Sequence, residues 1–373
     1  HVVGGQAYYW VSEILYGGSA DYAWYYGHGK MYAEALLAGR PDESGSFWLE
    51  SGEWCCTAFT IRTSGVFLAA LDLSIYSSFL LFSLIGYAGV IGFAMAFVRA
   101  FPSIPIGRYL VWIVYFPSLW YWPSALGKDA LMLAGIGLAT MGYVGKRGRI
   151  RWLPVISGAT LVFAVRPQVA IVLSAAFAAG YWLSSLRRFS LIRLVQSTVM
   201  TAAVLVVVVL AGETLGTSLS DAADVTTYLE ARSSAAATGG TAIEGASGAL
   251  APLLGVVTVL FRPFLWEVNG AAALVAALEV LVLWFIAWHR RRQIAGFIRA
   301  HRDHRLFWMA AAFIVLYAAS LGIAAGNLGL VARQRVHVFP FVFVFFAGLP
   351  TLRHMPGLWA RPRPRANQVS TVA

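Results

Sequence analysis

Long apolar runs separated by short basic clusters are the feature that most constrains this chain. Hydrophobic residues make up 59% of its 373 residues and charged residues only 12%, whereas a soluble domain is about a quarter charged. In a lipid bilayer each backbone polar group has to be satisfied within its own segment, which favours helices. The sequence therefore predicts an all-α, polytopic transmembrane helical bundle and excludes a soluble globular enzyme.

We expect about nine spans, several of them short or broken, because a full crossing needs about 20 residues. The predicted spans are Ile75–Val98, Tyr109–Trp122, Asp129–Gly145, Trp152–Val165, Gln168–Leu186, Val195–Gly212, Gly270–His289, Leu306–Gly326 and His337–Pro350. Three of the short ones adjoin polar breaks, two of which are Arg166-Pro167 and Arg333-Gln334-Arg335. Broken helices at membrane depth are tolerated only where the backbone faces protein or a water-filled cavity. We therefore expect the breaks to gather around one cavity.

The regions flanking the spans differ in composition. Residues 1–53 are mixed and polar and form a predicted extracytoplasmic segment, whereas 54–350 form the bundle, with a long outer loop at 213–250. The apolar stretch Trp54–Leu71 is too short for a clean crossing, so it is interpreted as interfacial or re-entrant. Residues 351–373 form a basic tail. The chain starts at His1 rather than Met, which leaves open a further helix before it.

The basic residues predict the orientation. Of the 28 Lys and Arg residues, 19 lie in segments 99–108, 146–151, 187–193, 289–305 and 353–365, where Asp303 is the one acid. With nine spans these segments share one side, which the positive-inside rule makes cytoplasmic, together with the C-terminus. We expect a bacterial inner-membrane protein. Its net charge of +11 then reflects contact with membrane lipids and not with nucleic acid.

Five basic residues lie at helix ends or breaks on the opposite, extracytoplasmic side. They are Lys128, Arg166, Arg262, Arg333 and Arg335. A charge at membrane depth costs about 2.5–3.5 kcal/mol on insertion scales, so its usual interpretation is functional. The planar fork of donors on arginine matches phosphate oxygens. The pattern thus indicates an anionic, lipid-linked ligand such as a polyprenyl phosphate or pyrophosphate.

Structural interpretations of the same residues stay open. Arg262 could form a plain ion pair with Glu267, and Lys128 with Asp129 could cap the following helix, where an acid at the N-terminus is favourable. Glu279 lies within a span, where it could pair with another helix or stay protonated. Three glycines on one predicted span favour close helix packing; they are Gly86, Gly89 and Gly92.

Two side chains are candidates for proton transfer. Asp21 lies among small and aromatic residues in Gly17-Gly-Ser-Ala-Asp-Tyr22, where a carboxylate could act as general base on a sugar hydroxyl. The alternative is an exposed acid in a solvated loop. His337 follows Arg335 closely and is the second candidate, although a single histidine at a helix end also has structural uses.

The layout resembles bacterial membrane glycosyltransferases of the GT-C type and O-antigen-polymerase-like proteins of surface polysaccharide pathways. The resemblance rests on an acidic first outer loop, many spans and extracytoplasmic arginines. The segments that carry it are Gly18–Tyr22, Phe116–Asp129, Arg166-Pro167, Arg262–Glu267 and Asn327–Arg335. It implies that Arg166, Arg333 and Arg335 hold the phosphate. Arg262 and Lys128 are further candidates for phosphate binding that would also shape the cavity, with Glu267, Asp129 and Asn327 as supporting residues.

The resemblance also implies the partners. They are a polyprenyl-linked sugar donor and a glycan acceptor, within a glycan-assembly complex as one option. Asp21 has no adjacent acid, unlike many GT-C enzymes, so no cofactor is implied with certainty and a divalent cation stays an option. The competing hypothesis is a transporter or flippase for an anionic lipid-linked substrate, in which the same arginines would bind cargo.

Overall fold

The chain is helical throughout its described part. A computed structural model describes residues 1–18, 20–50, 53–146, 148–185, 191–216 and 250–348, with Asp224, Thr227, Tyr228, Ala231, Ser233 and Ser234. Within these residues there is no β-strand, and an isolated bridge joins Lys146 to Arg149. The predicted all-α class is confirmed. Most of the predicted outer loop 213–250 and the whole tail 351–373 lie outside the described residues.

From α1 to α10 the helices follow one another with short connections. The α-helices are α1 (Val2–Tyr16), α2 (Asp21–Leu37), α3 (Phe47–Glu50), α4 (Cys56–Leu71), α5 (Ile75–Ala100), α6 (Gly107–Tyr115), α7 (Pro117–Tyr121), α8 (Lys128–Val144), α9 (Trp152–Val165), α10 (Pro167–Ser185), α11 (Leu191–Leu215), α13 (Ala251–Phe261), α14 (Ala271–His289), α15 (Arg291–His301), α16 (Arg305–Ala324), α17 (Leu328–Gln334) and α18 (Phe339–Phe346). Single 3-10 turns are η1 (Pro41–Glu43), η2 (Trp122–Ser124), η3 (Leu265–Glu267) and η4 (Arg335–His337).

Several helices have the length and apolarity of membrane spans. In the described part of the chain these are α5, α10, residues 197–215 of α11, α14 and α16. The pair formed by Leu328–His337 and Phe339–Phe346, bent by 59°, also qualifies if it is one broken span. The protein is therefore a multi-pass helical membrane protein. Three predicted spans are shorter than a full crossing: α8 has 17 residues, α9 has 14, and the third is divided into α6, α7 and η2.

Prolines account for the breaks. Proline has no N–H and its ring clashes with the preceding turn, so it suits the first turn of a helix and not the interior. Pro117 begins α7, which ends the predicted span Tyr109–Trp122 at Phe116. Pro167 likewise begins α10, and Arg166 between α9 and α10 has an extended backbone, with φ −149° and ψ 89°. The guanidinium of Arg166 thus projects from a junction between two helices.

Glycines bring α5 and α8 into close contact, as their spacing predicts. A Cβ atom on Gly86 would lie 2.2 Å from the carbonyl oxygen of Pro123, and one on Gly89 2.3 Å from that of Leu133. A Cβ on Gly92 would lie 2.7 Å from the Gly137 backbone. Only a residue without a side chain permits this approach. The close α5–α8 packing fixes the start of α8, which contributes Lys128 and Asp129.

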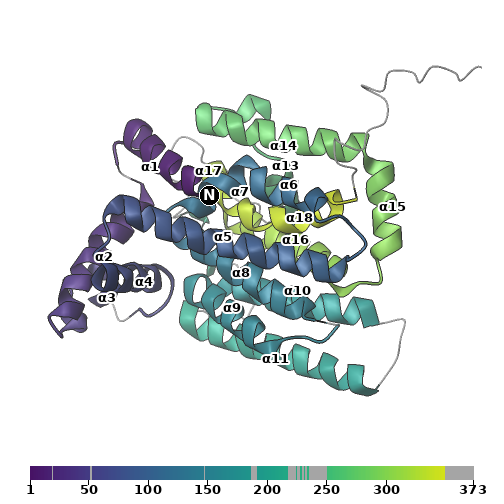
Figure 1. Cartoon of the computed structure of the whole chain (residues 1–373), viewed down its shortest axis with the longest axis horizontal. Helices are drawn as coiled ribbons and strands as arrows, with labels where there is room; N and C mark the ends of the chain where they lie inside the picture. Colours follow the sequence, from purple (N-terminus) through teal and green to yellow (C-terminus); the bar gives the residue numbers. More distant parts are fainter. Residues whose placement is uncertain are drawn as a thin grey trace, which may run out of the picture.

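The bundle has two different ends. In Figure 1, α5, α8, α10, α11 and α14 run along the long axis, whereas α15 crosses one end. Arg99 there donates to the carbonyl of Met141, at 3.3 Å, and Phe101 lies against His304, with ring centroids 5.3 Å apart. We call this the basic end, since segments 99–108, 146–151 and 289–305 meet there. The start of α8 lies one helix length away, about 24 Å at 1.5 Å per residue.

Helices that sequence analysis did not predict lie outside the main spans. Residues 1–53, described above as a polar segment, contain α1 and α2, and α13 follows the outer loop. Glycines again explain the packing of α13, because a Cβ on Gly322 of α16 would lie 2.2 Å from the Cα of Gly255. The stretch Trp54–Leu71 contains the 16-residue α4, shorter than a straight crossing.

Candidate functional site

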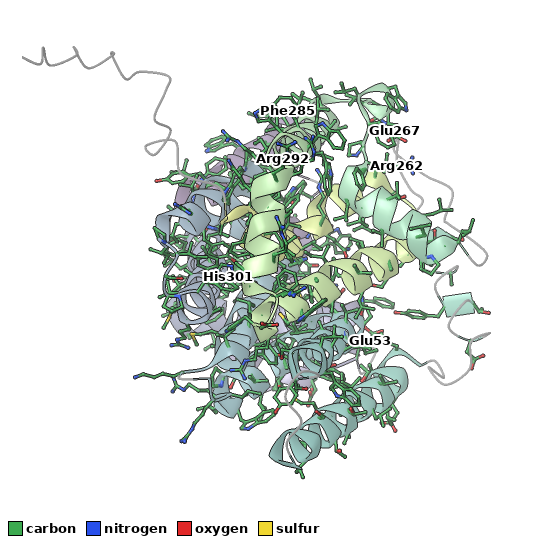
Figure 2. The ribbon with its side chains drawn as sticks, turned by 90° about the vertical axis from the view of Figure 1, so that its right-hand side faces the viewer. Glu53, Arg262, Glu267, Phe285, Arg292 and His301 are labelled. Carbon is green, nitrogen blue, oxygen red and sulfur yellow. A yellow bond between two sulfur atoms is a disulfide. The ribbon has the colours of Figure 1, made fainter. Side chains whose placement is uncertain are left out.

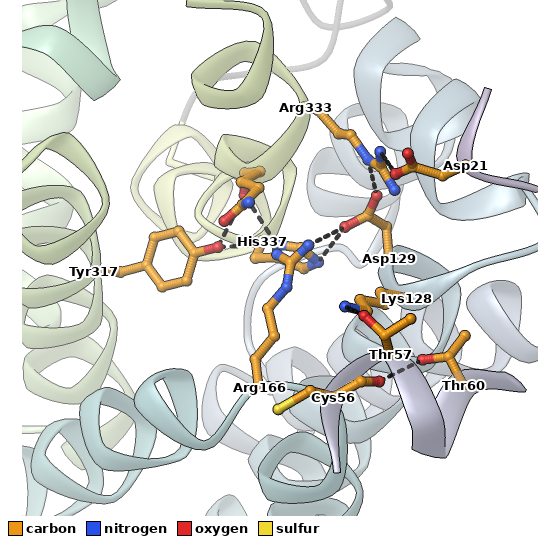
Figure 3. Close-up of polar contacts among 11 residues, drawn as sticks. Asp21, Cys56, Thr57, Thr60, Lys128, Asp129, Arg166, Tyr317, Arg333 and His337 are labelled. Atoms are coloured by element: carbon orange, nitrogen blue, oxygen red, sulfur yellow. Dashed lines mark hydrogen bonds and ion pairs between the residues drawn. The ribbon is translucent and has the colours of Figure 1, made fainter. Parts of the chain in front are cut away.

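Side chains from distant parts of the sequence meet around Asp129 at the end opposite the basic one. We call Asp21, Asp129, Arg166, Arg333 and His337 the Asp129 cluster; Figure 3 shows their contacts. They come from the starts of α2 and α8, the α9–α10 junction, α17 and η4. Each lies at or near a helix end or break, so the start of α8, the α9–α10 junction and the α17–η4 segment lie close together; the cavity expected there stays a prediction.

Asp129 is the centre of the cluster and is almost fully buried. Its side chain is 3% exposed, one oxygen, Oδ2, accepts from Nε of Arg333, and the other, Oδ1, accepts from Nη2 of Arg166 at 3.4 Å. It also lies in the first turn of α8, where the helix dipole favours a negative charge. A buried carboxylate is stable only when cations and hydrogen bonds compensate it. Asp129 therefore holds the two arginines in place and is more than the supporting residue that the sequence predicted.

Arg333 joins the buried acid to an exposed one. Its Nη1 lies 2.5 Å from Oδ2 of Asp21, whose side chain is 55% exposed, while its Nε contacts Asp129. The donors of one guanidinium thus bridge two carboxylates that are 108 positions apart in sequence. Asp21 begins α2 and is the cluster's most accessible acid. The structure therefore brings together Asp21 and Arg333, two of the predicted site residues.

Arg166 and His337 leave donors or acceptors unused. Nη1 of Arg166 and Nε2 of His337 are buried and have no hydrogen-bond partner among the described residues. Nε2 of His337 lies 3.8 Å from Oδ1 of Asp129, too far for a hydrogen bond. On its other side, Nδ1 of His337 lies 2.9 Å from the carbonyl of Gln334 and 3.1 Å from the Tyr317 hydroxyl. If Nδ1 carries the proton that the carbonyl accepts, Nε2 presents a lone pair.

Lys128 is held on the outer side of the cluster by α4. Its Nζ donates to Oγ1 of Thr57 at 2.8 Å. In turn Thr57 lies in the first turn of α4, next to a disulfide between the adjacent residues Cys55 and Cys56. Lys128 therefore adds positive charge beside Asp129 (Figure 3).

Arg335, predicted to act with Arg166 and Arg333, does not join the cluster. Its side chain is 1% exposed and donates to the carbonyls of Arg262 and Ala276, each at 2.8 Å. It also lies 4.0 Å from Oε2 of Glu279. Arg333 lies on α17 and Arg335 begins η4, and the two side chains leave the backbone toward different neighbours. Arg335 is therefore a buried link between α14, η4 and the end of α13.

Three more predicted residues make structural contacts. Arg262 and Glu267 form an ion pair, with Nη2 and Oε1 2.5 Å apart. Burial alone would raise the pKa of the Glu267 carboxyl, but hydrogen bonds from Arg262 and from the Phe264 N–H lower it. Asn327 caps α17, since its Oδ1 accepts from the N–H of Gly329 at 2.6 Å. These residues shape the surroundings of α14 and α17.

Some polar residues near the site escaped sequence reasoning. Tyr317 lies in the apolar span α16, and its hydroxyl donates to the Gln334 carbonyl at 3.2 Å. Ser118 donates to both oxygens of Glu279, from its N–H at 2.8 Å and from its hydroxyl. Glu279 thus pairs with another helix, one of the alternatives considered. The one sequence signal for Tyr317 is that it is a polar residue in an otherwise apolar span. This signal is weak, because tyrosine is also enriched at membrane interfaces.

The cluster's chemistry follows from its charges. Asp129 faces Arg166 and Arg333, and Asp21 faces Arg333. Nη1 of Arg166 is a buried donor without a hydrogen-bond partner among the described residues. Both carboxylates contact guanidinium groups. Among the residues that the structure describes, no group of three or more His, Cys, Asp and Glu side chains is placed to hold a metal ion. The site therefore offers an exposed carboxylate beside cations that can bind an oxyanion.

Comparison of the chain with known protein families, with curated proteins and with solved structures found no match. The fold and the site define a class, a multi-pass helical membrane protein with a buried arginine–aspartate cluster at one end of the bundle.

Proposed function

We propose that this protein is a glycosyltransferase or polysaccharide polymerase of the bacterial inner membrane that acts on polyprenyl-phosphate-linked sugars at the extracytoplasmic face. The observation that carries the proposal is the contact of Arg333 with both the exposed Asp21 and the buried Asp129. The positive-inside rule places the basic end in the cytoplasm, so the cluster at the other end faces outward, where lipid-linked sugars are used.

In this proposal Asp21 is the general base. It takes the proton of the acceptor hydroxyl, whose oxygen forms a bond to the anomeric carbon while the bond from that carbon to the phosphate oxygen breaks. Asp21 is preferred to His337 because its side chain is 55% exposed, whereas that of His337 is fully buried. A positioned base typically contributes 10²–10⁴-fold to a rate.

Arg333 and Arg166 stabilise the departing phosphate or pyrophosphate. Donors fixed before the reaction stabilise developing negative charge without reorganisation. Asp129 keeps the Nε of Arg333 and one nitrogen of Arg166 in place, which leaves Nη1 of Arg333 to move from Asp21 to a phosphate oxygen when substrate binds. Lys128 adds to the local positive potential. Asp129 is a positioning residue in this scheme.

Mass spectrometry of lipid-linked glycans tests the proposal in cells that lack the gene. We expect a polyprenyl-linked intermediate to accumulate: a complete repeat unit indicates a polymerase, and a unit short of one sugar indicates a transferase. Complementation with the unsubstituted gene should remove the intermediate, whereas Arg333→Ala, expressed at an equal level, should not. An unchanged lipid profile, or a fully active Arg333→Ala protein, would contradict the assignment.

The bent α17–α18 pair supports a second candidate function, a transporter or flippase for an anionic lipid-linked substrate. Broken helices near a binding site are common in transporters, and the bend of 59° lies at Val338, next to His337 of the Asp129 cluster. Liposomes that contain the purified protein separate the two functions. Movement of a fluorescent polyprenyl phosphate between leaflets without any new glycosidic bond would favour transport, and glycosidic product without such movement would favour the enzyme.

A further inference from the structure

Helix α15 differs from the spans in direction and in composition. It connects the end of α14 at His289 to the start of α16 at Arg305 and crosses the basic end of the bundle (Figure 1). Figure 2 looks onto this end, with α15 in front between Arg292 and His301. Because α14 and α16 are both long enough to span a membrane, a helix that joins their ends lies at the level of one membrane surface.

The apolar side of α15 is already covered by the protein. Phe297 is 6% exposed, and its ring centroid lies 5.5 Å from that of Phe101 at the end of α5. On the same side, a Cβ on Gly348 would lie 2.6 Å from the Cβ of Phe297, so the chain after α18 packs tightly against this ring. These contacts fix α15 against the bundle and turn its other side outward.

The outer side of α15 is basic. Arg291, Arg292 and Arg299 are exposed, and the helix contains no acidic residue. Between α14 and α16 the one acid is Asp303, which follows the end of α15. A basic helix face without compensating acids repels other cations and attracts anions in the surrounding medium.

Two aromatic residues indicate that the medium beside this face is lipid. Phe285 and Trp288 in the last turns of α14 are 68% and 71% exposed, on a helix that has the composition of a membrane span. Tryptophan near the end of such a span marks the headgroup level. Arg291 lies over the Trp288 ring, 4.7 Å from its centroid, and donates from Nη1 to the Trp288 carbonyl at 2.9 Å. Its guanidinium is thus fixed at the depth of the lipid phosphates.

We propose that α15 is a binding surface for anionic phospholipid headgroups, with its centre at Arg291 and Arg292 beside Trp288. Charge complementarity selects this partner, since the charged residues on the exposed side of α15 are all cations and the neighbouring exposed rings suit the upper part of an acyl chain. The surface lies at the end opposite the Asp129 cluster and is independent of the proposed catalytic function.

Lipid binding to the full chain in detergent tests the proposal. Fluorescently labelled phosphatidylglycerol and phosphatidylcholine are titrated separately, at low and at high salt. We expect tighter binding of phosphatidylglycerol, weakened by salt. The variant Arg291→Gln/Arg292→Gln/Arg299→Gln should lose about tenfold or more in affinity for phosphatidylglycerol and little for phosphatidylcholine, because each basic residue near a headgroup contributes about fivefold.

A control variant removes the same charge from the same end of the molecule. Arg108→Gln/Arg149→Gln/Arg151→Gln leaves α15 intact and should lower the affinity for phosphatidylglycerol clearly less than the α15 variant does. No preference for phosphatidylglycerol in the unsubstituted chain, or an equal loss in both triple variants, would overturn the proposal. If the α15 triple variant does not stay monodisperse, the single exposed change Arg292→Gln decides: a loss of about fivefold supports the surface, and an unchanged affinity refutes it.

Discussion

The two aspartates of the cluster share a cation and differ in environment. Asp129 is 3% exposed and contacts two arginines, whereas Asp21 is 55% exposed and contacts one. A buried ion pair that loses one partner leaves an uncompensated charge, which costs about 3–5 kcal/mol, whereas an exposed pair is worth little. The same substitution at the two positions should therefore have different effects.

We expect Asp21→Asn to reduce glycan-transfer activity by about 10²-fold or more while leaving thermal stability in detergent unchanged. Asp129→Asn should lower the unfolding temperature as well as the activity, since Arg166 and Arg333 lose their buried counter-charge. Activity in reconstituted liposomes and unfolding followed by intrinsic fluorescence check both. Arg40→Gln, which breaks an exposed ion pair with Glu43, is the neutral control. Equal stability loss in the two aspartate variants would contradict the assignment of Asp21 as a reactive group.

At the scale of elements, the α5–α8 contact depends on residues without side chains. A Cβ on Gly137 would lie 2.2 Å from the carbonyl oxygen of Gly89, whereas Gly296 in α15 has open space around it. We expect Gly137→Ala to destabilise the protein by about 1–3 kcal/mol through overpacking. Gly296→Ala should be neutral or stabilising, because alanine favours a helix more than glycine does by up to about 1 kcal/mol. Thermal unfolding of both variants measures the difference; equal behaviour would disprove close α5–α8 packing.

The cap of α16 makes stability depend on pH. Nδ1 of His304 accepts from the N–H of Leu306 at 3.1 Å, which requires an unprotonated nitrogen. Burial, together with Arg305 and His301, lowers the pKa of His304 to about 4. The folded pKa lies below the unfolded value of about 6.5, so this stabilisation is complete above pH ~6.5 and is lost as the pH falls toward 4. The unfolding temperature should fall less over this window in His304→Asn, and an identical pH profile would refute the role of this cap.

At the scale of the whole molecule, orientation decides on which side the Asp129 cluster works. In a Cys55→Ala/Cys56→Ala background, a cysteine that replaces Arg149 reports the basic end, and one that replaces Glu43, near the start of the chain, reports the opposite side. We expect a membrane-impermeant thiol reagent to label the second cysteine in intact spheroplasts and the first only after lysis. The reverse labelling pattern would place the cluster in the cytoplasm and remove the basis for an extracytoplasmic transferase.

Sequence alone determined the class of fold and the long apolar helices. The apolar runs predicted α9 at its exact bounds and α10, α14 and α16 to within two residues, because burial in lipid imposes length and composition on each segment separately. The glycine spacing likewise predicted close packing of α5. These properties are local, so they can be recognised without knowledge of the partners.

Only the tertiary structure decided which charges meet. Arg333 and Arg335 are two positions apart, yet one contacts Asp21 and Asp129 and the other contacts Glu279 and main-chain carbonyls. The direction of each side chain depends on the end of α17 and on the turn η4, and the partner of each depends on how distant helices pack. Asp129 is central for the same reason. Its two cations, Arg166 and Arg333, lie 37 and 204 residues away in the sequence. Sequence alone does not indicate which residues come into contact at such separations.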